Sequence, residues 1–342
     1  MRGKVIPVCA TGLIVTAAAV SSCGTPHSPA ASGAGKTASI TIGLPTSTPS
    51  FANSDVAVAQ AEGFFKKEGL NVNVESLSSG VPVVQGVVGG SLDIGASSTE
   101  PVVNAAAAGA PVQIIGSYAN KLTVDMVTPS GITAPAQLRG KRLGIQQVGA
   151  FREVMTRIVL EKAGMTQSDV SYVPGSASGY IGALVQGTIQ SGVLQEEQVL
   201  QVLDTDSKLH VLVNFAKSFP DYFYGGYVVS KSWLAGNESV AERFLAAITM
   251  AHRFMYKHKA ATVPIVAKNT GFSASVISRA YDVLVAQEGV FPVNSGLDTS
   301  RITDTINTMK KYHILTGTAP AESSLVNTGP ITAALAKLGG AP

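Results

Sequence analysis

The sequence predicts an α/β fold of two lobes with mainly parallel sheets, followed by a helical C-terminal part. Three observations predict it. Segments with the period of a strand alternate with segments at helical spacing from Ser39 onward. A second series of the same kind begins after Pro129, and the chain reads as almost wholly helical from Ser239 to Tyr312. Such alternation is typical of parallel strands that are joined and covered by helices.

The first series begins with a strand in which Ile40, Ile42 and Leu44 alternate with small or polar residues. A loop rich in Thr, Ser and Pro over Pro45–Ser54 precedes a helix over Asp55–Glu68. The other elements expected in this series are a strand at 72–77, a helix at 81–88, a strand at 93–96, a helix at 100–108 and a strand at 112–118.

The second series begins with a short helix at 135–138. It should continue with a strand at 142–146, a helix at 151–163, a strand at 170–173, a helix at 180–186, strands at 192–194 and 210–213, and an extended stretch at 222–230. In the helical C-terminal part we expect breaks near Pro264, Gly271 and Pro292, because these residues interrupt helices. A tail punctuated by Gly and Pro follows.

The N-terminus has the pattern of an export signal. Arg2 and Lys4 precede an uncharged, mostly apolar run from Val5 to Val20, which is too short and too rich in small residues for a spanning helix. The run ends in Ser-Ser-Cys, and small residues before Cys23 resemble a lipobox. We therefore expect residues 1–22 to be a lipoprotein signal peptide and Cys23 to carry lipid. An ordinary signal peptide with a chance cysteine is the alternative.

Residues 23–38 are then expected to form a flexible tether, since Gly, Ser, Ala, Thr and Pro dominate them. The body would lie outside the cytoplasm, anchored to the cell membrane by lipid rather than spanning it. Removal of the signal peptide would leave 320 residues, enough for about two domains.

Composition and motifs argue against several kinds of function. The net charge is only +3, and Arg2 and Lys4 contribute two of those charges, so nucleic acid is not an expected partner. Cys9 lies in the signal and Cys23 is used by lipid, which leaves no cysteine for a disulfide, a metal or a nucleophile. The five histidines lack zinc spacing, and no nucleophile elbow or phosphate-binding loop occurs. We expect no enzyme activity, no cofactor and no metal.

Three sequence motifs follow one another along the chain. Residues 59–72 read AQAEGFFKKEGLNV, residues 86–95 read GVVGGSLDIG and residues 135–144 read PAQLRGKRLG. A fourth, 190–198, matches loosely, with Gln190 in place of Asp and Glu197 in place of Pro. In order and spacing, from Ser39 to Ala286, they resemble the solute-binding proteins of ABC importers, of the nitrate/sulfonate/taurine and thiamine-precursor type.

The resemblance implies a two-lobed, type II periplasmic-binding-protein-like fold in which the chain crosses between the lobes twice. Lobe 1 would comprise 39–127 plus 229–340, and lobe 2 would comprise 128–228, with hinges near Val127–Ser130 and Tyr227–Ser230. A small organic solute would bind in the cleft, at loops after the carboxyl ends of strands. Hinge closure would enclose it. The implied partner is the permease of an ABC importer, and a monomer is expected.

On lobe 1, two loops supply candidate ligand-binding residues. Thr46 offers a hydroxyl and Phe51 a ring that would stack on the solute; the alternative is that Phe51 caps the edge of the core. Ser97, Ser98 and Thr99 follow a strand and open a helix, whose free N–H groups suit an anion or a carbonyl. Helix capping by Ser98 or Thr99 is compatible with this role.

On lobe 2, Gln147, Gly149 and Ala150 lie in the turn after a strand, where Gly149 lets the backbone approach a ligand. Glu196 matches the family's glutamate and would accept a hydrogen bond from an amine or a pyrimidine; its alternative role is a favourable charge at a helix start. Tyr224 would line the hinge side.

Arg152 is expected to be a solvated helix residue rather than a ligand for an anion. Without it the candidate loops contain no cluster of Arg or Lys, which favours a neutral or heterocyclic solute over a small sulfonate. Two other functions stay open: a lipoprotein that serves a sensor, and an enzyme like the thiamine-pyrimidine synthases. Those enzymes carry a cysteine-rich motif that this chain lacks.

Overall fold

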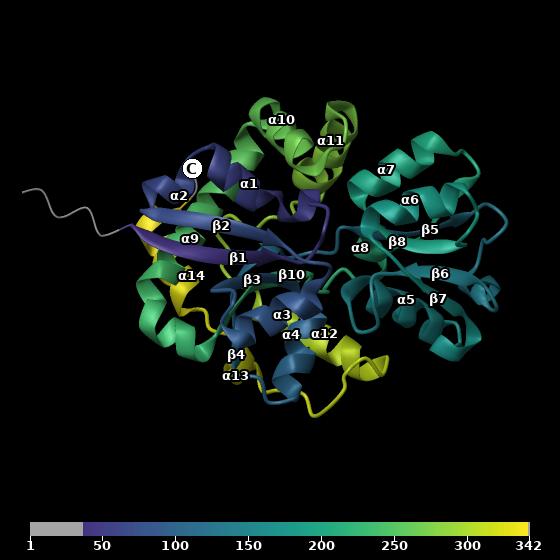
Figure 1. Ribbon diagram of the computed structural model, residues 1–342, viewed down its shortest axis with the longest axis horizontal. Helices are drawn as coiled ribbons and strands as arrows, with labels where there is room; N and C mark the ends of the chain where they lie inside the picture. The colour runs from purple at the N-terminus through teal and green to yellow at the C-terminus, as the bar shows by residue number, and fades with distance from the viewer. Residues whose placement is uncertain (1–36, 341–342) are drawn as a thin grey trace, which may run out of the picture. The chain divides into compact units, whose positions relative to one another are not determined.

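A computed structural model describes residues 37–340 (Figure 1). The expected signal peptide, Cys23 and nearly all of the tether lie outside the described residues. Within 37–340, no helix combines the length and the apolar character that crossing a bilayer requires.

The first sheet has five strands in the order β2-β1-β3-β10-β4. β1 (Ala38–Leu44) lies parallel to β2 (Leu70–Ser76) and β3 (Ile94–Ser98), whereas β10 (Gly225–Ser230) runs antiparallel to β3 and to β4 (Val112–Ala119). The sheet is therefore mixed. We call this sheet and the helices packed on it the first lobe.

Helices cover both faces of the first sheet (Figure 1). They are α3 (Gly80–Gly89) and α4 (Thr99–Ala107) on one side, with α1 (Ser54–Ala61), α2 (Phe64–Lys67), α9 (Lys231–Lys257) and α14 (Gly329–Leu338) on the other. The single helix expected over 55–68 is two helices, because Gly63 adopts the left-handed conformation with φ of 72° and ends the first one.

The second sheet has the order β7-β6-β8-β5-β9 and forms the second lobe. Its strands are β5 (Val124–Pro129), β6 (Arg142–Ile145), β7 (Ser171–Pro174), β8 (Ser191–Gln195) and β9 (Leu209–Asn214). β6 is parallel to β7 and β8, and β5 is antiparallel to β8 and β9. The helices of this lobe are α5 (Phe151–Lys162), α6 (Ala177–Val185), α7 (Glu196–Thr205) and α8 (Phe215–Ser218).

In each sheet, one strand runs antiparallel to its neighbours, and it is the first strand after the chain crosses from the other lobe. β5 follows β4 of the first sheet, and β10 follows the elements of the second. The expected lobe boundaries at 127/128 and 228/229 therefore fall inside β5 and β10, and the expected hinges lie on paired strands. The chain crosses instead at 120–123 and 219–224, before each strand begins. The strand β5 was missed because its pattern, with Asp125 among apolar residues, lacks regular alternation.

The C-terminal part is helical, with α10 (Lys259–Thr270), α11 (Ala274–Tyr281), a π-helical turn at Asp282–Gln287, and α12 (Thr299–Lys311) after α9. The chain breaks at Gly271 as expected, but α10 continues through Pro264. The tail also contains two helices, α13 (Glu322–Leu325) and α14.

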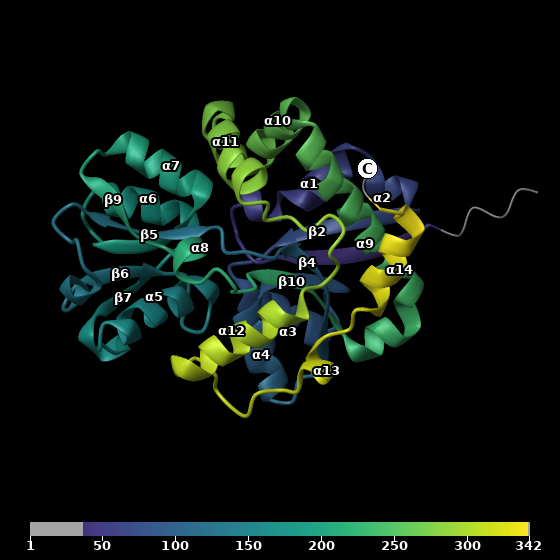
Figure 2. The same ribbon diagram turned by 180° about the vertical axis from the view of Figure 1, so that it is seen from behind.

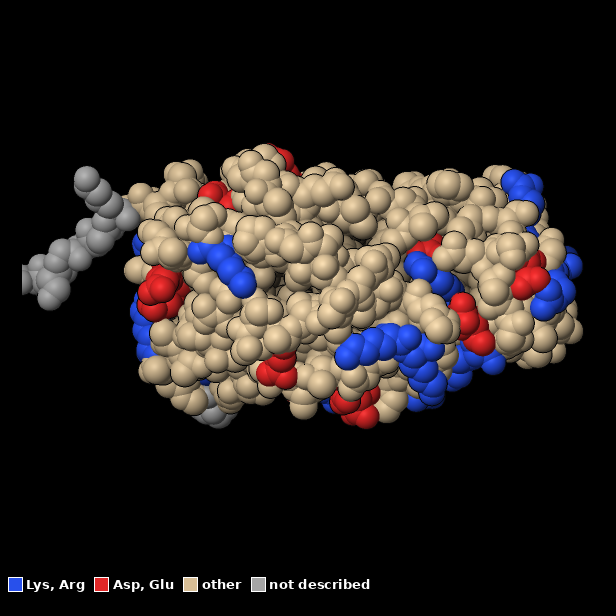
Figure 3. Space-filling view, turned by 90° about the horizontal axis from the view of Figure 1, so that it is seen from below, with Lys and Arg blue, Asp and Glu red and all other residues tan. Residues whose placement is uncertain are grey.

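Helix α11 belongs to this C-terminal part but packs against α7 of the second lobe, as both views show (Figures 1 and 2). Arg279 on α11 forms an ion pair with Asp204 on α7. The two lobes are therefore in contact through α11 as well as through the two crossing segments. On the face drawn in Figure 3, acidic and basic side chains are interspersed and most of the surface is uncharged.

Candidate functional site

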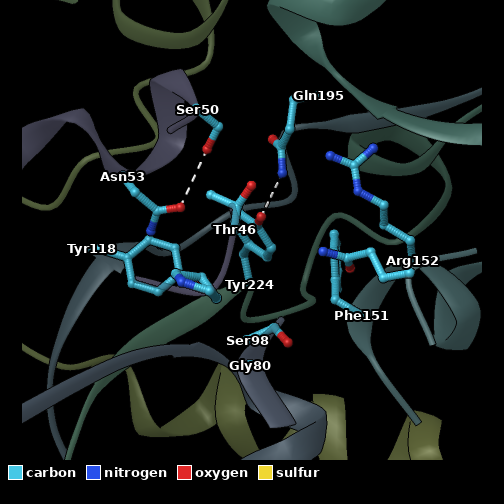
Figure 4. Close-up of a pocket in the computed structure, with 12 residues that line it drawn as sticks. Thr46, Ser50, Asn53, Gly80, Ser98, Tyr118, Phe151, Arg152, Gln195 and Tyr224 are labelled. Carbon is cyan, nitrogen blue, oxygen red and sulfur yellow. Dashed lines mark hydrogen bonds between the residues drawn. The ribbon is translucent and has the colours of Figure 1, made fainter. Parts of the chain in front are cut away.

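A small cavity lies where strand ends of the two sheets face each other (Figure 4). Its volume is about 20 Å³, enough for one water-sized group. The first lobe contributes Pro45, Thr46, Ser50, Asn53, Gly80, Ser98 and Tyr118; the second lobe contributes Gln146, Phe151, Arg152 and Gln195; and Tyr224 comes from the second crossing segment. Residues far apart in the sequence thus surround one space.

The loop after β1 supplies Thr46, Ser50 and Asn53. The Ser50 hydroxyl donates to Asn53 Oδ1 at 3.2 Å, and this bond fixes the amide (Figure 4). The other end of the amide, Asn53 Nδ2, is buried and has no hydrogen-bond partner. The Thr46 hydroxyl is used locally, since it donates to the carbonyl of Thr48 at 2.6 Å.

Two buried hydroxyls on the first sheet also face the cavity. Ser98 ends β3 and precedes α4, and Tyr118 lies on β4. The Ser98 hydroxyl lies toward Glu100 and that of Tyr118 toward Tyr224, yet neither makes a hydrogen bond of normal geometry. Ser98 does not cap α4 with its side chain, so the expected capping role is not seen. A ligand that reached either hydroxyl would therefore compete only with these poorly aligned contacts.

Gly80 allows the start of α3 to approach β3 closely. A Cβ atom at Gly80 would lie 2.5 Å from the hydroxyl oxygen of Ser97, so any side chain there would push the helix away. The Ser97 hydroxyl in turn donates to the carbonyl of Ser98 at 2.9 Å. Ser97 therefore supports the backbone of Ser98 next to the cavity, but it does not itself line the cavity.

Arg152 supplies the positive charge of the site, contrary to the expectation that it is solvated. It is 3% exposed, because the first turn of α5 directs it toward the sheet. Its guanidinium donates to the carbonyl of Val193 and, at 3.0 Å, to Gln198 Oε1. Among residues 37–340 no carboxylate forms an ion pair with it. Burial lowers the pKa of Arg152 from its usual value.

A chain of hydrogen bonds joins the two crossing segments through the cavity wall. Thr123, in the first segment, donates from its hydroxyl to Gln195 Oε1 at 2.7 Å. Gln195 Nε2 donates to the hydroxyl of Tyr224, in the second segment, at 2.6 Å (Figure 4). The Tyr224 ring packs on Phe151 and Tyr118, with centroids 4.6 Å and 5.4 Å away. Burial raises the pKa of Tyr224 to about 12, so it stays a neutral phenol.

Of the residues expected to bind the ligand, Thr46, Ser98 and Tyr224 line the cavity. Phe51 does not: it is fully buried in the core, against Tyr281 and Phe291, as in the alternative role. Thr99 is also turned away, since its hydroxyl donates to the carbonyl of Phe223 at 2.9 Å.

In the second lobe the lining residues are the neighbours of those expected. Gln147, Gly149, Ala150 and Glu196 do not line the cavity, whereas Gln146, Phe151, Arg152 and Gln195 do. Gly149, with φ of 80°, makes the turn and donates to Glu153. In the first of these loops the residue after β6 and the first two residues of α5 line the cavity, and in the second it is the last residue of β8, directly before α7.

Three carboxyl groups lie buried near the cavity and the crossing segments, and no sequence pattern indicated their burial. Glu100 accepts a hydrogen bond from Tyr222, and Glu197 accepts one from the backbone N–H of Phe51, across the lobes, at 3.3 Å. Burial raises the pKa of Glu100, of Glu197 and of Asp125 to about 7 in each case. Within residues 37–340, no cluster of His, Cys, Asp and Glu is placed to hold a metal ion.

Known proteins share this fold. The alkanesulfonate-binding protein SsuA from Xanthomonas axonopodis pv. citri, bound to MOPS, superposes with a TM-score of 0.71 at 18% identity, over 86% of this chain and 100% of that one. The architecture is therefore the two-lobed fold of periplasmic binding proteins, as the resemblance implied.

Relatives by sequence are of two kinds. A Brucella abortus (strain 2308) protein described as a binding protein is 24% identical over 216 residues, 63% of this chain and 67% of that protein. A 4-amino-5-hydroxymethyl-2-methylpyrimidine phosphate synthase from Candida albicans (strain WO-1) is 28% identical over 218 residues, 59% of this chain and 63% of the enzyme. The family model described as NMT1/THI5 like matches residues 51–262, more than half of the chain, and the protein therefore belongs to the NMT1/THI5-like family.

Proposed function

We propose that this protein captures a small solute between its two lobes. The observation that carries the proposal is the convergence of unpaired polar atoms on one cavity. Asn53 Nδ2, Ser98 Oγ and the Tyr118 hydroxyl are buried without hydrogen-bond partners, and the three residues that carry them line the cavity. Leaving a buried polar group unpaired costs about 1–3 kcal/mol, so a ligand that pairs these atoms recovers that free energy.

The chemistry of these groups favours a ligand rich in hydrogen-bond acceptors. An amide N–H₂ and two hydroxyls are able to donate, and the Arg152 guanidinium adds a positive charge from the other lobe. None of the described residues that line the cavity is a carboxylate. We therefore favour an anionic group, such as a carboxylate or a sulfonate, over the neutral or heterocyclic solute that the sequence suggested while Arg152 was placed in solvent.

Capture is the first step of the wider function that we propose. Lipid on Cys23 would hold the body at the outer side of the cell membrane, and the body, as a monomer, would deliver its solute to the permease of an ABC importer. The lipobox-like segment and the fold shared with a solute-binding protein support this proposal.

The test begins with thermal shift on the purified body, using a library of small carboxylates, sulfonates and neutral heterocycles. Hits are measured by calorimetry, and the bound compound is identified by mass spectrometry after denaturation. Binding of an anion that is recovered unchanged supports the proposal. Binding only of neutral heterocycles contradicts the anionic chemistry, and recovery of a converted compound would favour a synthase-like activity, as in the fungal relative.

A further inference from the structure

Glu197 is a buried carboxyl group that reaches from the second lobe to the first. It lies in the first turn of α7 and is fully buried. Its Oε1 accepts a hydrogen bond from the backbone N–H of Phe51 at 3.3 Å, and Phe51 directly follows Ser50, which lines the cavity. The other oxygen, Oε2, is buried and has no hydrogen-bond partner among the residues that the structure describes. The carboxyl group is therefore bonded at one oxygen only.

Two residues that line the cavity face this carboxyl group. They are Arg152 and Tyr224, and both interact electrostatically with Glu197 (Figure 4). Arg152 attracts the carboxylate but forms no ion pair with it among the described side chains. Its guanidinium donates instead to Gln198 and to the carbonyl of Val193. A negative charge held in the cavity by Arg152 would therefore act on Glu197 as well.

Several other titratable groups lie around α7. Glu196, the neighbour of Glu197 on this helix, disfavours a second negative charge beside it, and Arg152 and Glu196 are the two charged side chains that act on Glu197 most strongly. The elements packed on α7 contribute Asp125 from β5, which faces Glu196, Tyr180 from α6, which faces Arg152, His210 from β9, and Tyr281 and Arg279 from α11, of which Arg279 pairs with Asp204.

The balance of these effects places the carboxyl group close to its titration point at neutral pH. Burial raises the pKa of Glu197 to about 7, although hydrogen bonds from the backbone and the charge of Arg152 act in the opposite direction. An anion bound at the guanidinium would repel the carboxylate and offset its attraction to Arg152. Such an anion would raise this pKa further. Above about pH 7, the anion-bound protein would then hold a proton that the free protein lacks.

We propose that Glu197 takes up a proton when an anion binds in the cavity, so that the protein captures the anion and a proton together. The proton comes from solvent and adds to Oε2, since Oε1 accepts the hydrogen bond from Phe51. The anion thereby replaces the carboxylate as the counter-charge of Arg152, and the hydrogen bond between the lobes is kept. This inference rests on the proposed function, because it needs an anion at Arg152.

Calorimetry on the complete body measures the linked proton. The probes are acetate, methanesulfonate and benzenesulfonate, which keep a single negative charge across the neutral pH range. Titrations near neutral pH in Tris, triethanolamine and imidazole give the number of protons taken up, because these buffers are not anions and differ in their enthalpies of ionisation. If binding raises the pKa of Glu197 from about 7 to about 8, we expect uptake of about half a proton per anion and an affinity about tenfold weaker at about pH 9 than at about pH 6.

Two variants assign the proton to a residue. Glu197→Gln keeps an oxygen that accepts from Phe51 but stays neutral, so the proton uptake should vanish. Its affinity should remain, at every pH, close to that of the wild type at about pH 6. Asp125→Asn is the matched control, since burial also raises the pKa of Asp125 to about 7 but this carboxyl group faces Glu196 and Glu288 rather than Arg152. It should retain the uptake and the pH dependence of the wild type.

The outcomes are distinct. Wild-type binding without proton uptake, or with an affinity that is constant from about pH 6 to about pH 9, would overturn the linked proton and leave the anion capture intact. Uptake that persists in Glu197→Gln would show that another group takes the proton. If none of the three probes binds the wild type at about pH 6, where Glu197 is already neutral, the proposed anionic chemistry fails, and the linked proton fails with it. The wild-type measurements decide the question even where a variant is unstable.

Discussion

Arg152 donates to Gln198 Oε1 at 3.0 Å while lining the cavity, and its guanidinium has no carboxylate partner among the described residues. Glu197 attracts the buried guanidinium without forming an ion pair with it, so an anionic ligand in the cavity would stabilise this charge further. We predict that Arg152→Gln weakens binding of an anionic ligand by about tenfold to a hundredfold, as expected for loss of a charged hydrogen bond.

Calorimetry with the ligand found by the screen measures this effect, and the apo melting temperature serves as its control, since Arg152 also holds the carbonyl of Val193. Arg253 is the matched comparison, because it too makes several hydrogen bonds but lies away from the cavity. An Arg152→Gln protein with wild-type affinity would show that the ligand does not meet the guanidinium.

Tyr118 and Tyr222 provide a matched pair of buried tyrosines. The Tyr118 hydroxyl lacks a hydrogen bond, whereas that of Tyr222 donates to the buried carboxyl of Glu100. Tyr118→Phe should therefore leave the free energy of unfolding nearly unchanged and weaken ligand binding by about threefold to tenfold. Tyr222→Phe should lower the free energy of unfolding by about 1–3 kcal/mol, because it leaves Glu100 unpaired.

Denaturant unfolding and calorimetry on the two variants check this contrast. A large loss of stability in Tyr118→Phe would mean that its hydroxyl is paired in the free protein. Equal affinity in Tyr118→Phe and wild type would show that the ligand does not bond the Tyr118 hydroxyl.

The stability of the body should depend on pH through Glu100, Glu197 and Asp125. Burial raises the pKa of each carboxyl to about 7 in the folded protein, above the ordinary values of 4.5 for Glu and 3.8 for Asp. The folded state therefore binds more protons than the unfolded state between these values. The free energy of unfolding should accordingly fall as the pH rises from about 4.5 to about 7, by at most about 1.4 kcal/mol per pH unit for each group.

Glu197→Gln should flatten this dependence, because the amide stays neutral at every pH. Glu238→Gln, at an exposed position on α9, should leave it unchanged. Urea unfolding at a series of pH values gives the slope. A slope that is the same in wild type and in Glu197→Gln would mean that Glu197 does not contribute to it.

Lipid on Cys23 should determine where the protein is found in the cell. If it is lipidated, Cys23→Ser should move the protein from the membrane fraction to the soluble or secreted fraction, because one polar side chain replaces the acyl anchor. Detergent partitioning and mass spectrometry of the N-terminus report the change. Cys9→Ser is the control, since Cys9 lies within the expected signal peptide. Unchanged partitioning of Cys23→Ser would refute the anchor.

Ligand binding should close the cleft. The cavity draws residues from both lobes, so a bound solute contacts both and favours the closed arrangement. We expect the radius of gyration to decrease on binding and the melting temperature to rise, with about 2.7 kcal/mol gained at a hundredfold excess over the dissociation constant. X-ray scattering with and without the screened ligand measures the first change. Tight binding at a constant radius of gyration would show that the solute binds without any closure of the lobes.

Much of the fold could be predicted from the sequence, because strands such as β1 show clear alternation and phrases such as the one at 59–72 keep their order. The strand β5 could not, since its residues are buried on both faces and Asp125 interrupts the apolar run. This one strand accounts for the misplaced first lobe boundary.

The candidate site could be located to within one or two residues, but the direction of each side chain could not. A sequence pattern gives the turn after a strand, whereas the register of that turn decides whether Gln146 or Gln147, and Gln195 or Glu196, faces the cavity. Arg152 shows the consequence most clearly. As the second residue of α5 it looked solvated, and only the packing of α5 on the second sheet turns it inward.

The amide of Gln195 is bonded at one end to Thr123 and at the other to Tyr224, and so to both segments on which the lobes would turn. The same amide forms part of the cavity wall. The amide keeps one N–H and one oxygen lone pair beyond these two bonds, so a solute could bond Gln195 while both crossings stay attached. The side chain that such a solute contacts would then be the one that ties the two crossings together, and binding would be felt at both of them.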